Sequence, residues 1–190
     1  MAESIGLQLL KLMPLISSTV NLQFASDEIQ FFSAWTEMPQ DQTAKARQIL
    51  PWWMSSYLNR ALYQVLIGLP LPIATGVAQY IRLRPAGSSV FRDLLLYGPR
   101  GSQQTASRWY LAGSFFALAH FFFAPKAKRL LEQMSSQSPA SKETNIEAVN
   151  QWLQMHYIRS VVADIPAFVC FLRAAMIASA RPLNLKVVGS

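Results

Sequence analysis

The chain has 190 residues, and 52% of them are hydrophobic against 14% charged, a ratio outside the range of ordinary soluble globular domains. The formal net charge is +7, yet the basic residues are scattered between apolar stretches and form no run, which argues against a nucleic acid partner. The single cysteine and the lack of Cys and His ligand spacings exclude a disulfide framework and a structural zinc site.

The first two apolar segments predict two membrane-spanning helices. Residues 5–24 are interrupted only by Lys11, whose ammonium group can reach the membrane interface. Residues 61–81 contain no Asp, Glu, Lys or Arg, and as a helix they measure about 30 Å, roughly the thickness of the hydrocarbon layer. Pro70 and Pro72 within this second segment predict a kink, which membrane helices tolerate when neighbouring helices satisfy the released carbonyl groups.

Two further apolar segments follow in the second half of the chain. Residues 109–125 are uncharged, rich in phenylalanine and closed by a basic stretch, and they predict a third span. Residues 158–180 contain three charged residues, but the stretches between these are compatible with lipid, and we expect a fourth span. The spacing of Thr144 and Glu147 matches a capping box, which predicts that the helix leading into the fourth span begins there.

Together the four segments predict an all-α fold, a four-helix transmembrane bundle in a single domain over residues 1–190. Tryptophan and tyrosine residues flank the segments as in the aromatic belts of membrane proteins, so the lipid bilayer is the expected surrounding. A soluble all-α bundle is the alternative, and it needs polar helix faces that residues 61–81 and 109–125 do not supply.

The ends and sides of this bundle are predicted from charge. Glu3 stands where a cleaved signal peptide has basic residues, so we expect residues 5–24 to remain as a membrane anchor. Lysine and arginine divide almost equally between the two sides of the membrane, which leaves the orientation open with a slight preference for cytoplasmic termini.

Asp164 is the acidic residue that the predicted spans place at membrane depth, where a charged group needs a partner. Arg159 is five residues away, about 140° around an α-helix, so the two side chains do not pair ideally along one helix. We expect the partner of Asp164 to come from another helix, with Lys11 or Asn21 as candidates.

Four polar residues in or just before the third and fourth predicted spans are the candidate catalytic residues: His120, His156, Arg159 and Asp164. Around a pocket between helices they can supply a base, an acid and a cation that stabilises an anion. The structural alternatives are a hydrogen bond between helices for a histidine, an ion pair for Asp164, and an arginine that extends to the interface for Arg159.

Cofactor motifs are absent from the sequence. There is no Gly-x-Gly-x-x-Gly fingerprint, no phosphate-binding loop and no His-Glu-x-x-His motif, and two histidines with few carboxylates disfavour a redox metal site. We therefore expect neither a bound cofactor nor a metal, and any chemistry to be carried by side chains and substrate.

The four spans, the aromatic connection with Phe31, Phe32 and Trp35, and the C-terminal run NIEAVNQWLQMHYIRSVVADIPAFVCFLRAA resemble the small membrane proteins grouped with fungal anthrone oxygenases. Trp152, followed by His156 and Arg159 and a proline-containing last helix, is the strongest part of this resemblance.

The resemblance implies a cofactor-independent, membrane-embedded oxygenase that acts on a lipophilic phenolic or polyketide intermediate in secondary-metabolite biosynthesis. It also implies an endomembrane location such as the endoplasmic reticulum, and other enzymes of the pathway as partners. In such an enzyme a base removes an acidic proton and the resulting anion reduces dioxygen directly. His120 or Asp164 is the expected base, and Arg159 with His156 the expected anion stabilisers.

Two other functions remain open from the sequence. The same pocket fits a cyclase or isomerase that moves protons on a lipophilic intermediate without oxygen. A non-catalytic adaptor with four spans is the third reading, in which the basic connection from Arg82 to Arg108 docks soluble pathway enzymes.

Overall fold

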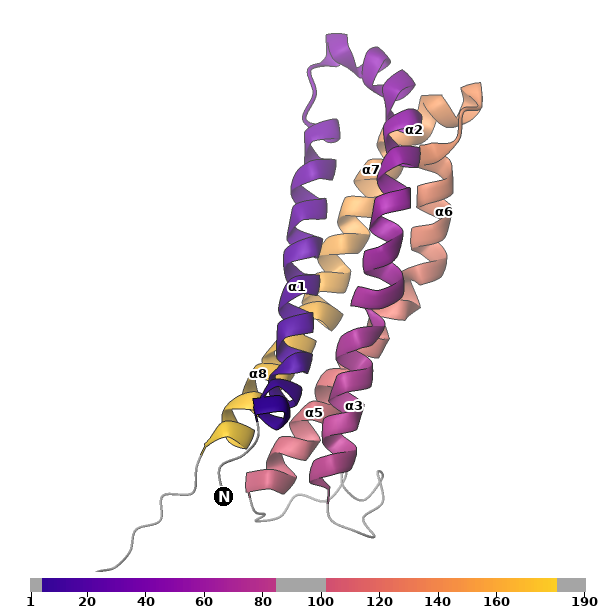
Figure 1. Cartoon of the computed structure of the whole chain (residues 1–190). Coiled ribbons are helices and arrows are strands. Elements are labelled where there is room, and N and C mark those ends of the chain that lie inside the picture. Colours follow the sequence, from indigo (N-terminus) through magenta and orange to yellow (C-terminus); the bar gives the residue numbers. More distant parts are fainter. Residues whose placement is uncertain (1–4, 85–101, 181–190) are drawn as a thin grey trace, which may run out of the picture.

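A computed structural model describes residues 5–84 and 102–180, and within these ranges the regular structure is entirely helical (Figure 1). Four long helical rods run side by side. The first rod is α1 (Ile5–Thr36). The others are α2 (Gln40–Tyr63), the π-helical turn η1 (Gln64–Gly68) and α3 (Pro70–Leu83); α5 (Ser102–Ala119), the 3-10 turn η2 (His120–Phe123) and α6 (Ala124–Ser135); and α7 (Pro139–Arg159), the π-helical turn η3 (Ser160–Asp164) and α8 (Ile165–Ser179). The predicted all-α four-helix bundle is confirmed.

Three of the rods, Ile5–Thr36, Gln40–Leu83 and Pro139–Ser179, are long and apolar enough to cross a membrane. The predicted span 109–125 lies in the remaining rod, where η2 divides the helix. All the rods are longer than the hydrocarbon layer of a membrane is thick. Even the shortest rod, α1 with 32 residues, measures about 48 Å, whereas the hydrocarbon layer measures about 30 Å. The predicted spans are therefore only one half of each rod.

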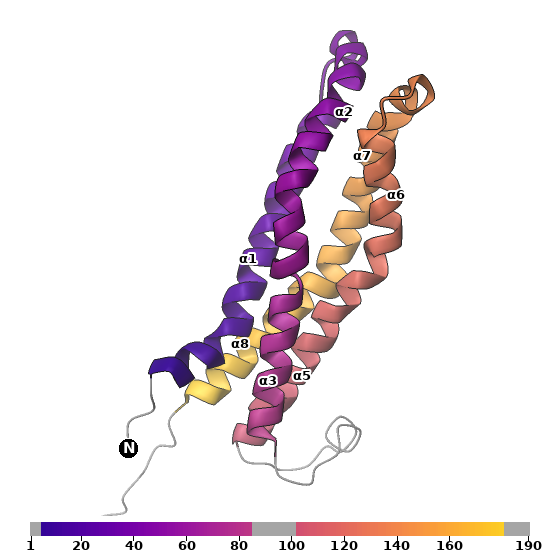
Figure 2. The same ribbon diagram turned by 45° about the vertical axis from the view of Figure 1, so that its right-hand side comes forward.

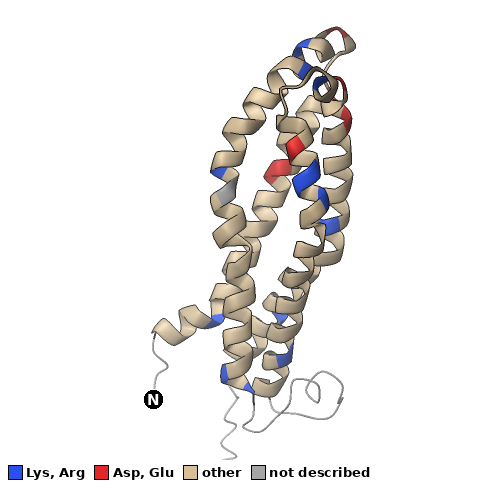
Figure 3. Cartoon of the chain, turned by 90° about the vertical axis from the view of Figure 1, so that its right-hand side faces the viewer, with Lys and Arg blue, Asp and Glu red and all other residues tan. Residues whose placement is uncertain are grey.

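The bundle has two halves with different surfaces. We call residues 5–24, 61–84, 102–125 and 158–180 the apolar half, and residues 25–60 and 126–157 the charged half. The large hydrophobic side chains that are exposed in the described residues belong to the apolar half, with the exceptions of Phe31, Ile49, Trp52 and Tyr157. Most acidic residues belong to the charged half, whereas the far end of the apolar half shows basic residues (Figure 3). This distribution is that of a membrane-embedded half continued by a water-exposed half.

Each half has its own core. In the charged half, Phe32, Met54 and Trp152 belong to a cluster of buried aromatic and aliphatic side chains between α1, α2, α6 and α7. In the apolar half, α3, α5 and α8 approach closely around Phe171, and a Cβ atom added to Gly113 would lie 2.6 Å from the ring of Phe171. Small residues at such contacts let membrane helices pack without a hydrophobic driving force between them.

Several local predictions need correction. Phe31, Phe32 and Trp35 do not form a connection but lie in the last turns of α1, which ends only at Thr36. The capping-box prediction at Thr144 is also wrong, because α7 begins at Pro139.

The start of α7 follows from its own sequence. The hydroxyl of Ser138 accepts a hydrogen bond from the backbone N–H of Ser141 at 3.2 Å, and the fixed backbone angle of Pro139 favours the first helical position. In the predicted docking connection, Arg92 and Arg100 lie outside the described residues.

Prolines explain where the last three rods change their helical pitch. The turns η1, η2 and η3 are followed by Pro70, Pro125 and Pro166, each at the first or second position of the next helix. A proline has no N–H to donate, and its ring clashes with the carbonyl group four residues earlier, which in all three rods belongs to the irregular turn. The predicted kink at Pro70 is thus one of three such breaks.

Candidate functional site

The three irregular turns lie at about the same level of the bundle, at the boundary between the apolar and charged halves (Figure 2). A cavity of about 410 Å³ lies there, bounded by α1, α2, η1, η2, α6 and α7. Most of its wall is apolar, with side chains such as Phe24, Leu58 and Leu131. The polar side chains in the wall are Asn21, Glu28, Gln64, His120, Lys128, Glu132, Ser135 and Arg159.

Asp164 pairs with two of the predicted site residues. Its Oδ1 lies 2.9 Å from Nδ1 of His120, and its Oδ2 accepts a hydrogen bond from Nε of Arg159 at 3.2 Å. The expectation that Arg159 does not pair well with Asp164 is wrong because the chain between them is η3. In this π-helical turn the N–H of Ile165 bonds to the carbonyl group of Ser160, five residues earlier, and residues five apart are brought nearly above one another.

The network continues from Arg159 toward α1 and α2. Nη2 of Arg159 lies 2.8 Å from Nε2 of His156, and this same ring nitrogen lies 2.6 Å from Oε2 of Glu28. The hydroxyl of Tyr57 donates to Oε1 of Glu28 at 2.7 Å. A continuous polar chain therefore joins Tyr57, Glu28, His156, Arg159, Asp164 and His120 across the four rods.

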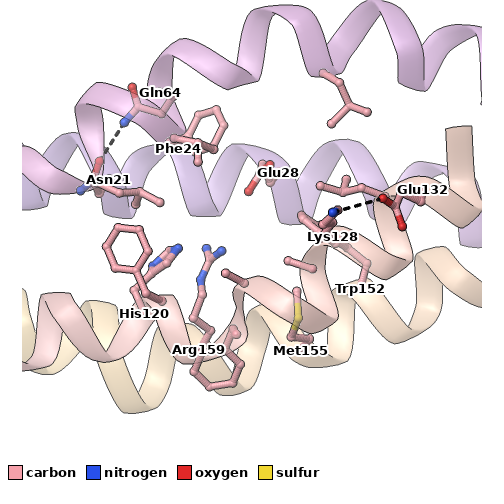
Figure 4. Close-up of a pocket in the computed structure, with 18 of the residues that line it drawn as sticks. Asn21, Phe24, Glu28, Gln64, His120, Lys128, Glu132, Trp152, Met155 and Arg159 are labelled. Carbon is pink, nitrogen blue, oxygen red and sulfur yellow. Dashed lines mark hydrogen bonds and ion pairs between the residues drawn. The ribbon is translucent and has the colours of Figure 1, made fainter.

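Only part of this network faces the cavity. Glu28, His120 and Arg159 line it, and in Figure 4 the side chains of His120 and Arg159 extend from one wall toward the opposite side of the space. Asp164 and His156 stand behind them, and His156 is completely buried. Asp164 instead contributes to a much smaller cavity on the other side of His120. The two groups behind the wall hold the groups in the wall in place.

The four candidate residues thus come together, and two further members were missed. Glu28 follows the predicted first span, in a stretch read as a connection, and Tyr57 precedes the second. Glu28 is only 6% exposed. Had the first helix been extended beyond residue 24, Glu28 would have been a charged residue inside the bundle and therefore a candidate. Arg173 is exposed on α8 and is not part of the network.

The expected partners of Asp164 bind elsewhere. Asn21 donates to the carbonyl group of Gly68 at 2.9 Å and accepts from Gln64 at 2.8 Å, which ties α1 to η1 beside the cavity. Lys11 donates to the carbonyl group of Ala178 at 3.3 Å, near the far end of the bundle. The partner from another rod is His120, and the prediction of Lys11 or Asn21 is wrong.

The arrangement can exchange protons with a molecule in the cavity. A carboxylate only accepts hydrogen bonds, so an ionised Asp164 requires the proton of His120 on Nδ1 and leaves Nε2 as the basic nitrogen. Arg159 meets Asp164 and His156 through Nε and Nη2, and neither contact uses Nη1. A base and a fixed cation therefore stand side by side in a wall that is otherwise largely apolar.

The cation at the centre of the network is a side chain, the guanidinium group of Arg159. In residues 5–84 and 102–180, no group of three or more His, Cys, Asp and Glu side chains is arranged to hold a metal ion. The guanidinium group of Arg159 occupies the position between Asp164 and His156 where a cation would otherwise stand.

Comparison with known proteins finds relatives over almost the whole chain. It is 31% identical to Epoxidase gkaX of Penicillium citrinum, over 93% of this chain and 98% of the relative. Epoxidase pydX of Acremonium sp is 31% identical over 91% of this chain and 96% of the relative, and Probable epoxidase scpX of Mollisia scopiformis is 29% identical over 90% and 96%.

Anthrone oxygenases are not named among these three relatives. No family model matches the chain, and no solved structure does. For both relatives at 31% identity, the alignment covers more than nine tenths of this chain and of the relative. The chain therefore belongs to the family of these fungal epoxidases.

Proposed function

We propose that this protein is a membrane-embedded oxygenase that epoxidises a carbon–carbon double bond of a lipophilic phenolic or polyketide intermediate in secondary-metabolite biosynthesis. The observation that carries the proposal is the convergence of His120, Arg159 and Glu28 on one largely apolar cavity of about 410 Å³. Such a cavity suits a lipophilic molecule, and its few polar groups fix the orientation. The name epoxidase carried by the relatives supplies the reaction class.

The proposed reaction needs no electron donor besides the substrate. The substrate gives up two hydrogen atoms, one oxygen atom of dioxygen enters the product, and the other leaves as water, so atoms and electrons balance. His120 removes a proton through Nε2 while Asp164 holds the ring at Nδ1. Arg159 stabilises the resulting anion, whose electrons then pass to dioxygen. This refines the expected roles, with His120 rather than Asp164 as the base that meets the substrate.

The position of the cavity fits a substrate dissolved in a membrane. Val65 and Phe121 line it and are also exposed on the outside of the bundle, at 41% and 38%. Lys128 and Glu132, 3.8 Å apart, line its other end in the charged half. We propose that the substrate enters from the bilayer, in an endomembrane such as the endoplasmic reticulum, and that the product passes to other enzymes of the pathway.

The test compares a strain that lacks the gene with the parent strain. We expect a lipophilic intermediate to accumulate in the deletion strain, and the purified protein in detergent to convert it to an epoxide with uptake of one dioxygen per product. His120→Gln should reduce turnover by about 100-fold or more, because a positioned general base contributes about that much. An unchanged rate in this variant contradicts the role of His120.

A cyclase or isomerase is the second candidate, because a base and an acid on one cavity are sufficient for it. The same purified protein separates the two. Conversion of the intermediate to an isomer under nitrogen, at the rate seen in air, would establish the isomerase and refute the oxygenase.

A further inference from the structure

Glu28 is a buried carboxyl group on the cavity to which the first steps of the proposed reaction give no task. It enters from α1, opposite the rods that carry His120 and Arg159, and is 6% exposed (Figure 4). Both of its oxygen atoms have partners, the hydroxyl of Tyr57 at 2.7 Å and Nε2 of His156 at 2.6 Å. A buried carboxyl group that is held in place by a hydroxyl group and an imidazole ring suggests a definite chemical role.

The contacts of His156 leave the position of one proton open. Its Nε2 lies 2.6 Å from Glu28 and 2.8 Å from Nη2 of Arg159, which is a donor. A protonated Nε2 can donate to Glu28 but cannot accept from Arg159, whereas an unprotonated Nε2 can accept from Arg159 or from a protonated Glu28. Nδ1 of His156 is buried without a hydrogen-bond partner, so no neighbour fixes the tautomer. One proton can therefore sit on either His156 or Glu28.

The charge of the network favours keeping such a proton. Glu28 and Asp164 are two acidic groups, and Arg159 is their one permanent cation. With both histidines neutral and both carboxyl groups ionised, the buried network would carry an uncompensated negative charge, which is costly away from water. One further proton, shared by Glu28 and His156, makes the network neutral.

The later part of the proposed reaction requires a proton donor. After one oxygen atom has entered the substrate, the bond between the two oxygen atoms must break, and the departing oxygen carries the negative charge. Releasing hydroxide into a largely apolar cavity is unfavourable, whereas a donor beside it lets the oxygen leave as water. His120 is the base of the first step, and its second nitrogen is held by Asp164.

We propose that Glu28, sharing its proton with His156, is the acid that protonates the departing oxygen, and that Tyr57 positions its carboxyl group. This inference rests on the proposed oxygenase function. Two protons leave the substrate and two arrive on the departing oxygen. His120 transfers one of them, and Glu28 donates the other before taking up the second substrate proton. Both groups end the cycle as they began, and the substrate remains the only reductant.

The test is the coupling of oxygen uptake to product in Glu28→Gln. This variant keeps the size of the side chain and an oxygen that accepts from Tyr57, but it lacks the acidic proton. We expect oxygen uptake to continue while epoxide formation falls by about 100-fold. Hydrogen peroxide or a substrate hydroperoxide should appear in its place, detected by a peroxidase assay and by mass spectrometry. His120→Gln should instead stop oxygen uptake itself.

Two further variants make the result specific. Glu147→Gln removes a carboxylate of the charged half that pairs with Arg47 away from the cavity, and it should couple oxygen to product as the wild type does. Glu28→Asp keeps an acidic proton on a shorter side chain and should restore part of the coupling, which also covers a folding defect of Glu28→Gln.

Full coupling in Glu28→Gln overturns the inference and leaves the proposed function standing. The same holds if Glu28→Asp loses oxygen uptake, as His120→Gln is expected to do. Absence of oxygen uptake by the wild-type protein overturns the proposed function and the inference with it.

Discussion

Removal of the carboxylate of Asp164 tests whether this group holds His120 and Arg159 together. Asp164 is 8% exposed and bonds to both Arg159 and His120, and Arg159 itself is 7% exposed. Asp164→Ala leaves a buried guanidinium group without its carboxylate, which typically costs about 3–5 kcal/mol. In a protein of this size each kcal/mol lowers the melting temperature by about 2–4 °C, so we expect a decrease of about 6–20 °C.

The matched control is an ion pair of the same chemistry at the surface. Arg47 and Glu147 lie 2.9 Å apart, but the side chain of Glu147 is 52% exposed. Such pairs contribute about 0–1 kcal/mol, so Glu147→Ala should lower the melting temperature by no more than about 4 °C. Both variants are compared in one detergent by the thermal unfolding of tryptophan fluorescence. Equal shifts for the two variants would refute the claim that Asp164 is a buried anchor.

A second substitution separates stability from orientation of the base. Asp164→Asn keeps the shape of the side chain and an oxygen for Arg159, so its melting temperature should fall less than that of Asp164→Ala. The amide cannot hold His120 in the tautomer that exposes a basic Nε2, and turnover should still fall by about 100-fold. Wild-type turnover in this variant would show that the ring of His120 needs no orienting carboxylate.

The cavity, the membrane boundary and the helix packing each give a further prediction. Ala127→Trp places an indole in the cavity and should raise the KM for the intermediate by at least about tenfold, whereas an unchanged KM would place the substrate elsewhere. Phe115 and Trp52 are exposed alike, at 65% and 68%, in the apolar and the charged half. Phe115→Lys should lower the yield in the membrane fraction, at a cost of about 2.5–3.5 kcal/mol, and Trp52→Lys should not; equal yields would contradict the boundary. Gly113→Ala should cost about 1–3 kcal/mol in thermal unfolding, since the new Cβ meets Phe171 at 2.6 Å; an unchanged melting temperature would mean that the helices can separate there.

The four helical rods were largely predictable, because the mean hydropathy of a stretch of about twenty residues can be read from the sequence alone. The apolar segments located one half of every rod, and Pro70 predicted the break in the second rod, whereas the breaks before Pro125 and Pro166 were not predicted. Most of the charged half was missed, apart from the helix expected to lead into the fourth span from Thr144, because polar helices give no hydropathy signal. Thus α1 was expected to end at residue 24, although it continues to Thr36 and contributes the buried Glu28.

Four members of the polar network were predicted as candidates from the sequence, whereas Glu28, Tyr57 and the contacts between the members were not. Charged and imidazole groups among apolar segments identified His120, His156, Arg159 and Asp164, because such groups rarely occur there without partners. Their pairing depended on η3, whose geometry differs from the α-helix assumed for the angle between Arg159 and Asp164. The contact between His156 and Glu28 joins residues far apart in the chain, so it could not be predicted from the spacing of residues along one helix.

The most direct test of the account is turnover under isotopically labelled dioxygen. The purified protein, treated with a chelator, is given ¹⁸O₂ and the intermediate that accumulates in the deletion strain, with no added reductant. We predict one labelled oxygen atom in the epoxide and one in water, with one dioxygen consumed per product. An epoxide whose oxygen comes from labelled water, or a reaction that requires an added reductant, would contradict an oxygenase in which the substrate supplies the electrons and the network of His120, Arg159 and Glu28 moves the protons.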